Sequence, residues 1–340
     1  MKKYILIVLI FFYSYSTSSS TLFDTDYYEI KFISDNVQAT KLIKIKEIKY
    51  LTIKKILKKI LIKSDYVNIN KKINEDLINS FIQNVIIENE KIINKNYFSN
   101  IKINFNKRKI ISYLRNNDLR YVEFFPDSFL TIIYSKSDFE KTLFSKYNEY
   151  YNYFLLNNFD IYMLPNLDSN DKYLLNHNDI EEKNLGKIYK FSEKYNKSDI
   201  IIIISEKKQK KIFYKFFLIT NGQTYEISDL LQNEINYNEL FVNLKDSAIN
   251  IWKINNAIQN KFTNTINCKI RYFNLLEQKE ILKKMNNILL IDKKKLLKFS
   301  YQEKLYEISY FGNKQILLKL FEINNLKIEN RNNNCRLSLL

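Results

Sequence analysis

Residues 200–227 read IIIIISEKKQKKIFYKFFLITNGQTYEI, and this stretch contains three consecutive predicted strands. The aliphatic run at 200–204 is typical of a buried strand. Residues 212–220 and 223–227 flank Asn221-Gly222, and an Asn-Gly pair between two strand-like runs is a strong signal for a two-residue hairpin. We therefore expect a β-sheet in the middle of the chain.

The elements around this sheet define a second unit over residues 138–260. An aromatic-rich helix is expected at 139–157, a strand at 159–164, and helices at 186–195 and 239–258. The segment 166–182 is rich in Asn and Asp, which predicts a polar loop. The crowded aromatic residues of the first helix suit either a stacking surface for bases or sugars or a packing face, and helical spacing favours packing. They are Tyr147, Tyr150, Tyr151, Tyr153 and Phe154.

The first unit is expected over residues 23–135. It begins with a strand at 27–33 and a long helix at 39–63. A short helix at 74–83 precedes a predicted hairpin of 85–93 and 97–105. A helix at 107–116 and a strand at 129–134 complete the unit.

The third unit, 264–330, has the clearest pattern. Strand 266–273, helix 276–285, an interrupted strand at 288–299, strand 304–311, helix 314–323 and strand 326–328 follow one another. This β-α-β-β-α-β order is that of the ferredoxin-like unit. Residues 331–340 are expected to form a loose tail. The sequence thus predicts an α+β protein of three successive small α/β sandwich-like units.

The first twenty residues have the layout of a secretory signal peptide. Lys2 and Lys3 precede an apolar stretch at 4–13, and a segment of small polar residues follows. The apolar stretch is shorter than the roughly 20 residues that span a bilayer. We expect cleavage near residues 18–20, with an uncleaved anchor as the alternative, and hence an exported, periplasmic protein.

The chain carries a formal net charge of +17, which would favour anionic partners. The abundance of Lys, Asn, Ile, Tyr and Phe is also what AT-rich codons produce, so base composition is a competing explanation. Residues 41–63 contain nine lysines and one acid. This helix either lies on an anionic membrane or packs on a core with its lysines in solvent, and the packing role is more common. The candidate membrane-facing residues are Lys41, Lys44, Lys55, Lys58 and Lys59.

Three stretches resemble the DUF2066 family, exported proteobacterial proteins of unknown function. The first comprises residues 85–91, Tyr97 and 101–111, and the second comprises residues 164–171 and 195–203. The third comprises Trp252-Lys253 and the turn at 310–313 before a leucine-rich helix. Asn166 stands where members of the family favour glycine. The resemblance implies an envelope protein of stacked α+β units and implies no activity.

The residues usually needed for catalysis are scarce. His177 is the sole histidine and lies in the polar loop, where we expect a solvated side chain. Three glycines leave no Gly-x-Ser-x-Gly turn and no phosphate-binding loop. Asp168, Asp171 and Asp179 would offer oxygen ligands to calcium, but the spacing of a calcium loop is missing, which favours turn and capping roles. We expect no catalytic residue, no cofactor and no metal.

The charge and the aromatic residues raise two classes of partner, nucleic acid and an envelope protein. Lys211, Tyr214, Lys215 and Phe216 have the mix of basic and aromatic residues found on nucleic-acid-binding strands, but an exported protein rarely meets nucleic acid, so we expect none. The sequence instead favours a non-enzymatic envelope protein with an unidentified protein partner. Peripheral membrane contact and an envelope enzyme with an unrecognised carboxylate site are the alternatives.

Cys268 and Cys335 are the only cysteines. In a ferredoxin-like unit the last strand lies beside the first, so a residue after the last strand comes close to the start of the first. The two cysteines either form a disulfide, which an exported protein permits, or remain a buried Cys268 and a free Cys335 in the tail.

Overall fold

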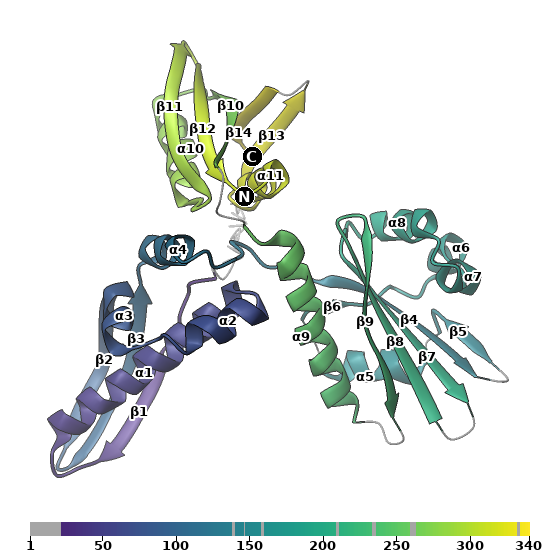
Figure 1. The fold of residues 1–340 in the computed structure, drawn as a ribbon, viewed down its shortest axis with the longest axis horizontal. Coiled ribbons are helices and arrows are strands. Elements are labelled where there is room, and N and C mark those ends of the chain that lie inside the picture. The colour runs from purple at the N-terminus through teal and green to yellow at the C-terminus, as the bar shows by residue number, and fades with distance from the viewer. Residues whose placement is uncertain are drawn as a thin grey trace, which may run out of the picture.

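The computed structural model describes residues 22–137, 140–145, 147–157, 160–208, 211–232, 236–258, 263–331 and 334–340. Within these ranges the chain forms sheets of three, six and five strands together with helices, which confirms the α+β class. The three sheets extend as arms from a common junction (Figure 1). The predicted signal at residues 1–20 lies outside the described residues.

The first arm is a three-stranded antiparallel sheet in the order β1-β3-β2, covered by a long helix. The Asn36 side chain accepts a hydrogen bond from the Ala39 backbone N–H (3.0 Å) and so caps the start of that helix. Alternate residues of β3 are buried, as expected of a strand with one covered face. The elements are β1 (Tyr28–Ile33), α1 (Val37–Ile60), α2 (Lys63–Asn70), α3 (Glu75–Phe81), β2 (Ile82–Ile93), β3 (Asn96–Phe105) and α4 (Lys107–Asn116).

The second arm has helices on both faces of its sheet. Ile200 and Ile202 pack with the helix that contains Ile188, whereas Ile201 and Ile203 belong to the core that contains Phe241. The strand order is β5-β4-β7-β8-β9, and β6 pairs with β4. The elements are β4 (Phe129–Ser137), β5 (Lys141–Leu143), α5 (Glu149–Asn157), β6 (Tyr162–Met163), α6 (Ser169–Leu174), α7 (His177–Glu181), α8 (Leu185–Glu193), β7 (Ile200–Lys208), β8 (Lys211–Thr220), β9 (Gln223–Gln232) and α9 (Tyr237–Asn256).

Three expectations for this region are wrong. β4 was expected to close the first unit, but it pairs in parallel with β7, because its first six residues are buried on both faces and need two helical layers. The helix expected at 139–157 is limited to α5. The polar segment 166–182 contains α6 and α7, because Asp168 and Asn176 each cap a helix through a capping box.

The third arm is a five-stranded sheet in the order β11-β12-β10-β14-β13, with α10 and α11 on one face. The predicted succession of two helices and four strands is present. The tail is not loose, however, because buried Cys335 and Leu337 alternate along a fifth strand, which lies between β10 and β13. The fourth strand is therefore not beside the first, unlike in a ferredoxin-like sheet. The elements are β10 (Thr263–Arg271), α10 (Leu275–Asn287), β11 (Ile291–Ser300), β12 (Glu303–Phe311), α11 (Lys314–Ile323), β13 (Leu326–Arg331) and β14 (Asn334–Leu339).

The arms meet around Tyr121, which is fully buried. Its backbone forms isolated β-bridges with Leu61 of the first arm and with Ile258, which follows α9. Nearby, Trp252 of α9 packs edge-on against Phe124, with ring centroids 5.2 Å apart. Buried apolar residues of all three arms belong to one contiguous cluster. The junction is therefore packed core rather than a set of linkers.

A buried lysine strengthens the junction. Lys253 of α9 donates hydrogen bonds through Nζ to the backbone oxygens of Lys58 (2.7 Å) and Leu61 (3.0 Å). The last carbonyls of α1 have no partner inside their own helix, so Lys253 satisfies them. Burial lowers the pKa of Lys253 to about 8, with a smaller contribution from the charge of Lys58.

Candidate functional site

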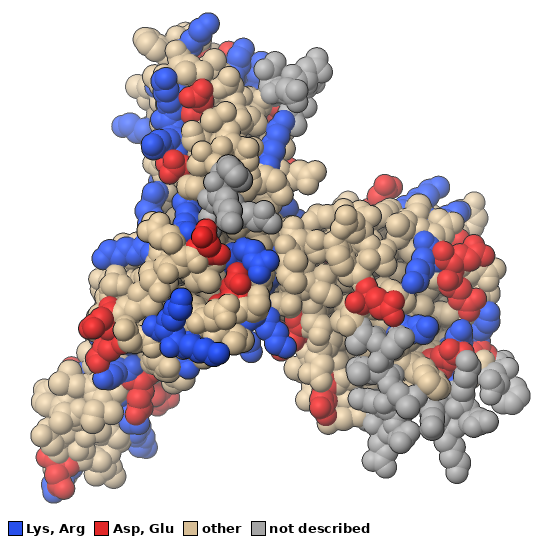
Figure 2. All heavy atoms as spheres, viewed as in Figure 1, with Lys and Arg blue, Asp and Glu red and all other residues tan. Residues whose placement is uncertain are grey.

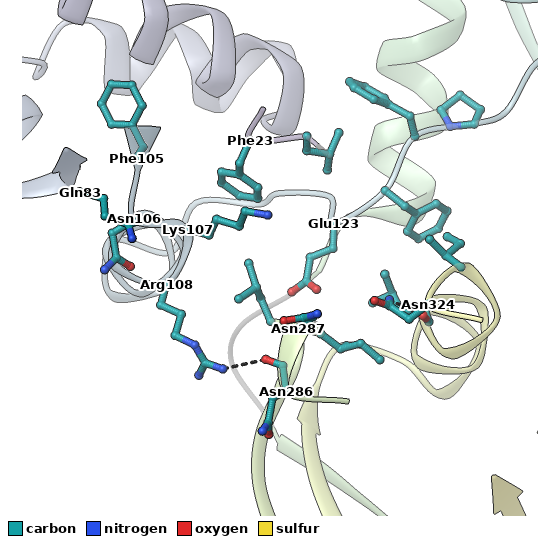
Figure 3. Close-up of a pocket in the computed structure, with 18 of the residues that line it drawn as sticks. Phe23, Gln83, Phe105, Asn106, Lys107, Arg108, Glu123, Asn286, Asn287 and Asn324 are labelled. Atoms are coloured by element: carbon teal, nitrogen blue, oxygen red, sulfur yellow. Dashed lines mark hydrogen bonds between the residues drawn. The ribbon is translucent and has the colours of Figure 1, made fainter. Parts of the chain in front are cut away.

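A cavity of about 760 Å³ lies where the first and third arms meet (Figure 3). Its walls are the start of α4, the segment 123–127, and the C-terminal ends of α10 and α11. This volume is in the range of about 300–1,000 Å³ that is typical of small-molecule sites. The apolar part of the lining includes Phe23, Phe105, Phe124, Ile288, Leu320 and Ile323.

Two cations of α4 lie at the cavity because of how that helix begins. The Asn106 side chain accepts a hydrogen bond from the Lys109 backbone N–H (3.1 Å), so Lys107 and Arg108 occupy the first turn. The Arg108 guanidinium donates to the backbone oxygen of Asn286 (2.7 Å), near the end of α10. This hydrogen bond satisfies a terminal helix carbonyl and joins the two arms at the cavity wall.

Glu123 is the acidic group at the centre of the cavity. The residue is partly buried, its Oε1 atom is fully buried, and no described group forms a hydrogen bond with that atom. Figure 3 shows the carboxyl pointing into the space near Phe23 and Asn287. Burial raises the pKa of Glu123 to about 7, although the Arg115 cation and the backbone N–H groups of Leu290 and Leu289 oppose the shift. Near neutral pH the group therefore exists in both protonation states.

Arg115 of α4 connects the first and third arms next to the cavity. Its Nε donates to the Tyr121 hydroxyl (2.9 Å), and its Nη2 donates to the backbone oxygen of Leu289. The guanidinium also lies over the Phe311 ring. One side chain thus connects α4, the central Tyr121 and two segments of the third arm.

The chemistry of this cavity suits binding. Apolar walls would cover an apolar body, and the Glu123 carboxyl would accept a hydrogen bond from a donor buried with it. Asp127 is the other acid in the lining, and it is exposed. Glu123 and Asp127 thus differ in burial within this cavity. Among the described ranges, no group of three or more His, Cys, Asp or Glu side chains is placed to hold a metal ion.

The five candidate lysines of α1 are divided between contacts and solvent. Lys41 forms an ion pair with Glu90 (2.6 Å) and is only 15% exposed, and Lys44 pairs with Glu47 (2.8 Å). Lys55 lies over the Tyr28 ring, 5.0 Å from its centroid. Lys58 and Lys59 are exposed in the last turn, where cations favour the negative end of the helix dipole. The candidate face consequently offers less free charge than the sequence suggests.

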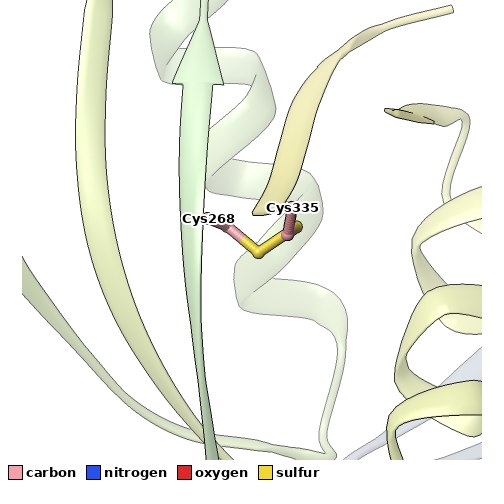
Figure 4. The surroundings of a disulfide bond; sticks show 2 residues. All are labelled: Cys268 and Cys335. Atoms are coloured by element: carbon pink, nitrogen blue, oxygen red, sulfur yellow. A yellow bond between two sulfur atoms is a disulfide. The ribbon is translucent and has the colours of Figure 1, made fainter. Parts of the chain in front are cut away.

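The two cysteines are brought together as a disulfide (Figure 4). Parallel pairing of β10 with β14 places Cys335 directly opposite Cys268, with Cα atoms 4.4 Å apart. The alternative of a free Cys335 depended on a loose tail, and β14 removes that condition. Both cysteines are buried, so the bond lies in the core of the third arm.

The candidate calcium ligands have structural roles. Asp168 and Asp171 form the capping box of α6, and both carboxylates lie 2.8 Å from Lys194 Nζ. Buried Asp171 also accepts a hydrogen bond from the Tyr195 hydroxyl (2.6 Å). Asp179 belongs to the capping box of α7. The capping role that the sequence favoured accounts for all three.

His177 was expected to be a solvated loop residue, and this expectation is wrong. It begins α7, is partly buried, and stacks on Tyr134 with ring centroids 6.5 Å apart. Its loop contains a helix because Asn176 provides the cap, so the imidazole is held against the sheet.

The aromatic residues of the second arm mostly belong to its core. Tyr150, Tyr151 and Phe154 of α5 are buried, as are Tyr214 and Phe216 of β8. The Tyr150 and Tyr214 hydroxyls lie 3.0 Å apart, within hydrogen-bonding distance. Tyr147, in contrast, is 95% exposed. The packing interpretation of this cluster therefore holds for the buried rings.

Sequence reasoning missed Glu123 and Arg115. The signal that was available is the lone acid inside the apolar run Tyr121-Val122-Glu123-Phe124-Phe125-Pro126. A charged residue in such a run is seldom buried without a partner. Nothing in the sequence indicated that the run would lie between two arms.

The class that the fold and the cavity define is an α+β protein with a ligand-sized cavity between two of its units. No family model, curated protein or solved structure matches the chain. In the described part of the chain, no helix is long and apolar enough to span a bilayer.

Proposed function

We propose that this chain is a non-enzymatic protein of the cell envelope that binds a partner protein, and that the junction cavity receives a segment of that partner. The observation that carries the proposal is a cavity of about 760 Å³ with largely apolar walls, into which the Glu123 carboxyl points. The buried Oε1 of Glu123 has no donor in the free chain, which is costly, and a rearrangement of the side chain on binding that brings a donor to it would remove this cost.

The proposed location and family rest on the sequence alone. The signal-like residues 1–20 support export to the periplasm, and three short stretches support the resemblance to the DUF2066 family. Both remain predictions. Detection of the chain in a periplasmic fraction, cleaved near residues 18–20, would support the predicted export.

The position of the cavity suits recognition of a protein segment. Two arms contribute to its walls, so an occupant would contact both and would stabilise their relative placement. Lys107 and Arg108 lie on one wall, where acidic residues flanking a bound segment would meet them. The preferred partner segment is therefore an apolar one with a hydrogen-bond donor and acidic neighbours.

Site-specific photo-crosslinking in envelope fractions tests this proposal. A benzoyl-phenylalanine at Ile323, which lines the cavity and is 42% exposed, is expected to capture a discrete partner. The same group at Leu155, which is 68% exposed on α5, serves as the control and should not capture it. Filling the cavity with Asn287→Trp should abolish the crosslink. No capture at Ile323, together with turnover of a wall or lipid substrate by the purified chain, would show that the protein is an enzyme instead.

A further inference from the structure

The free face of the third sheet carries a group of cations, which we name the basic face: Lys269, Arg271, Lys293, Lys295 and Lys298. Each pairs in register with Glu303, Leu305, Glu307 or Ser309 of β12. Residues opposite one another in an antiparallel pair share a face. The intervening residues, such as Ile308 and Tyr310, are buried on the helix-covered side. All five cations therefore point away from α10 and α11.

The basic face carries more positive than negative charge. The five cations are exposed, and Glu303 and Glu307 are the acids that share the same registers. Among the described residues, none of the five cations has a carboxylate oxygen within 4.0 Å. Lysine and arginine side chains run along this arm in Figure 2. Their charge is thus available to an anionic partner.

Large apolar side chains lie at the end of the same sheet. Five residues are between 69% and 90% exposed, and we name them the apolar tip: Phe273, Leu275, Leu276, Phe299 and Tyr301. They come together because the Tyr272 backbone N–H donates to the Gln302 oxygen (3.1 Å), which joins the end of β10 to the β11–β12 turn. Arg271 pairs with Glu303 at the same level.

The apolar tip is the end of the arm that lies farthest from the junction. Thr263 at the start of β10 pairs with Phe311 at the end of β12, and Phe311 contacts Arg115 of the first arm. The opposite end of these strands therefore projects outward (Figure 1). A projecting turn with exposed aromatic and aliphatic side chains, next to lysines, is the arrangement with which peripheral proteins enter the interfacial layer of a membrane.

We propose that the third arm docks end-on on an anionic phospholipid surface, with the apolar tip inserted among the headgroups and the cations of the basic face nearest the tip, Arg271 and Lys298, beside them. Charge complementarity selects this occupant, because excess lysine charge beside exposed aromatic residues is attracted to acidic lipid. This contact is independent of the junction cavity, and it lies on a different arm from the α1 lysines.

Vesicle co-sedimentation of the full chain tests this docking. Vesicles of equal parts phosphatidylcholine and phosphatidylglycerol should bind it more tightly than phosphatidylcholine alone, and high salt should weaken the binding. Replacing Arg271, Lys295 and Lys298 by Glu should weaken it about 100-fold, since each surface cation contributes roughly fivefold. Phe299→Ser combined with Tyr301→Ser should weaken it as well.

Matched controls decide between the two lysine surfaces. Lys44, Lys55 and Lys59 changed to Glu make the same charge change on α1, and Leu155→Ser with Leu156→Ser removes exposed apolar groups from α5. Both controls should bind as the unchanged chain does. All variants retain residues 1–21, so any affinity of the apolar stretch at residues 4–13 for vesicles is common to all of them. Unchanged melting temperatures would show that each variant folds.

Three outcomes would overturn the proposal. These are equal binding to charged and uncharged vesicles, unaltered binding by both third-arm variants, and loss of binding by the α1 variant alone. An independent measurement uses the Tyr301→Cys variant, labelled at that cysteine with an environment-sensitive fluorophore. Its emission should shift to the blue on charged vesicles, whereas an unshifted spectrum would exclude insertion of the tip.

Discussion

The guanidinium carbon of Arg115 lies 3.9 Å from the centroid of the Phe311 ring, so a helix of the first arm and a strand of the third arm are held by a cation–π contact. The same guanidinium donates to the Tyr121 hydroxyl and to the Leu289 backbone oxygen. Arg115 is therefore the side chain through which we expect the two arms to be coupled most strongly.

Arg115→Ala should lower the free energy of unfolding by about 2–4 kcal/mol, because a stacked and hydrogen-bonded guanidinium is lost and buried acceptors lose their donor. Arg115→Lys keeps the charge but not the planar fork, and it should recover only part of the loss. Urea unfolding measures both. Arg271→Ala, at an exposed arginine of the third arm, is the control and should change stability by less than about 0.5 kcal/mol. An equally small effect at Arg115 would contradict the coupling.

Glu123 should make stability depend on pH. Its pKa is about 7 in the folded chain against an ordinary value of 4.5, so between these pH values the unfolded chain loses a proton that the folded chain retains. Stability attributable to this group is thus greatest below pH 4.5, falls as the pH rises to 7, and is constant above that. The total cost is about 3 kcal/mol at 1.36 kcal/mol per pKa unit.

Glu123→Gln removes this titration and keeps the shape of the side chain. The variant should therefore gain stability over the unchanged chain by about 3 kcal/mol between pH 4.5 and 8. Urea unfolding across this range measures the difference. Asp127→Asn, at the exposed acid of the same cavity, is the matched control. A difference that does not vary with pH would show that Glu123 is not buried as described.

Lys253 should make the free energy of unfolding depend on pH in the alkaline range. Burial lowers its pKa to about 8 from an ordinary 10.5, so between these values the unfolded chain holds a proton that the folded chain has released. Stability therefore rises with pH over that interval, by about 3 kcal/mol. Relative to Lys253→Met, the unchanged chain should gain this amount. Chemical unfolding between pH 8 and 10.5 measures it, with Lys59→Met as the exposed control, and a constant difference would contradict the prediction.

The disulfide should contribute to stability of the third arm. It links residues 67 positions apart, for which the chain-entropy model gives about 4 kcal/mol. Reduction, or replacement of Cys268 and Cys335 by Ser, should lower the free energy of unfolding by about that amount. Alkylation after unfolding without reductant should add no mass to the chain. Two added alkyl groups would mean that the bond is absent.

Much of the local structure could be predicted from the sequence. Asn221-Gly222 forms the hairpin turn with positive φ at both residues (49° and 78°), as the short-range signal required. The apolar spacing of residues 39–63 gave a helix that differs from α1 by a few residues at each end. Such features follow from neighbouring residues, whose preferences are fixed before any tertiary contact forms.

The errors concern elements whose structure depends on distant partners. Residues 129–134 look the same whether they close the first sheet or enter the second, and only pairing with β7 decides. Residues 334–339 alternate apolar and polar side chains over only six positions, which is too short a pattern to decide between a strand and a loose tail. The partners that β10 and β13 supply on both edges decide it. Pairing across long separations is not encoded in local periodicity.

The candidate site illustrates the same division. The sequence by itself determined the α+β class, most helices and strands, and the two cysteines that are able to pair, because these depend on local propensity and on residue type. Only the tertiary structure decided that Glu123 and Arg108 line one cavity, that Lys253 caps α1, and that lysines from β10 and β11 share one face. These groups are far apart along the chain, and their chemistry arises from burial and proximity, which packing of the three arms alone creates.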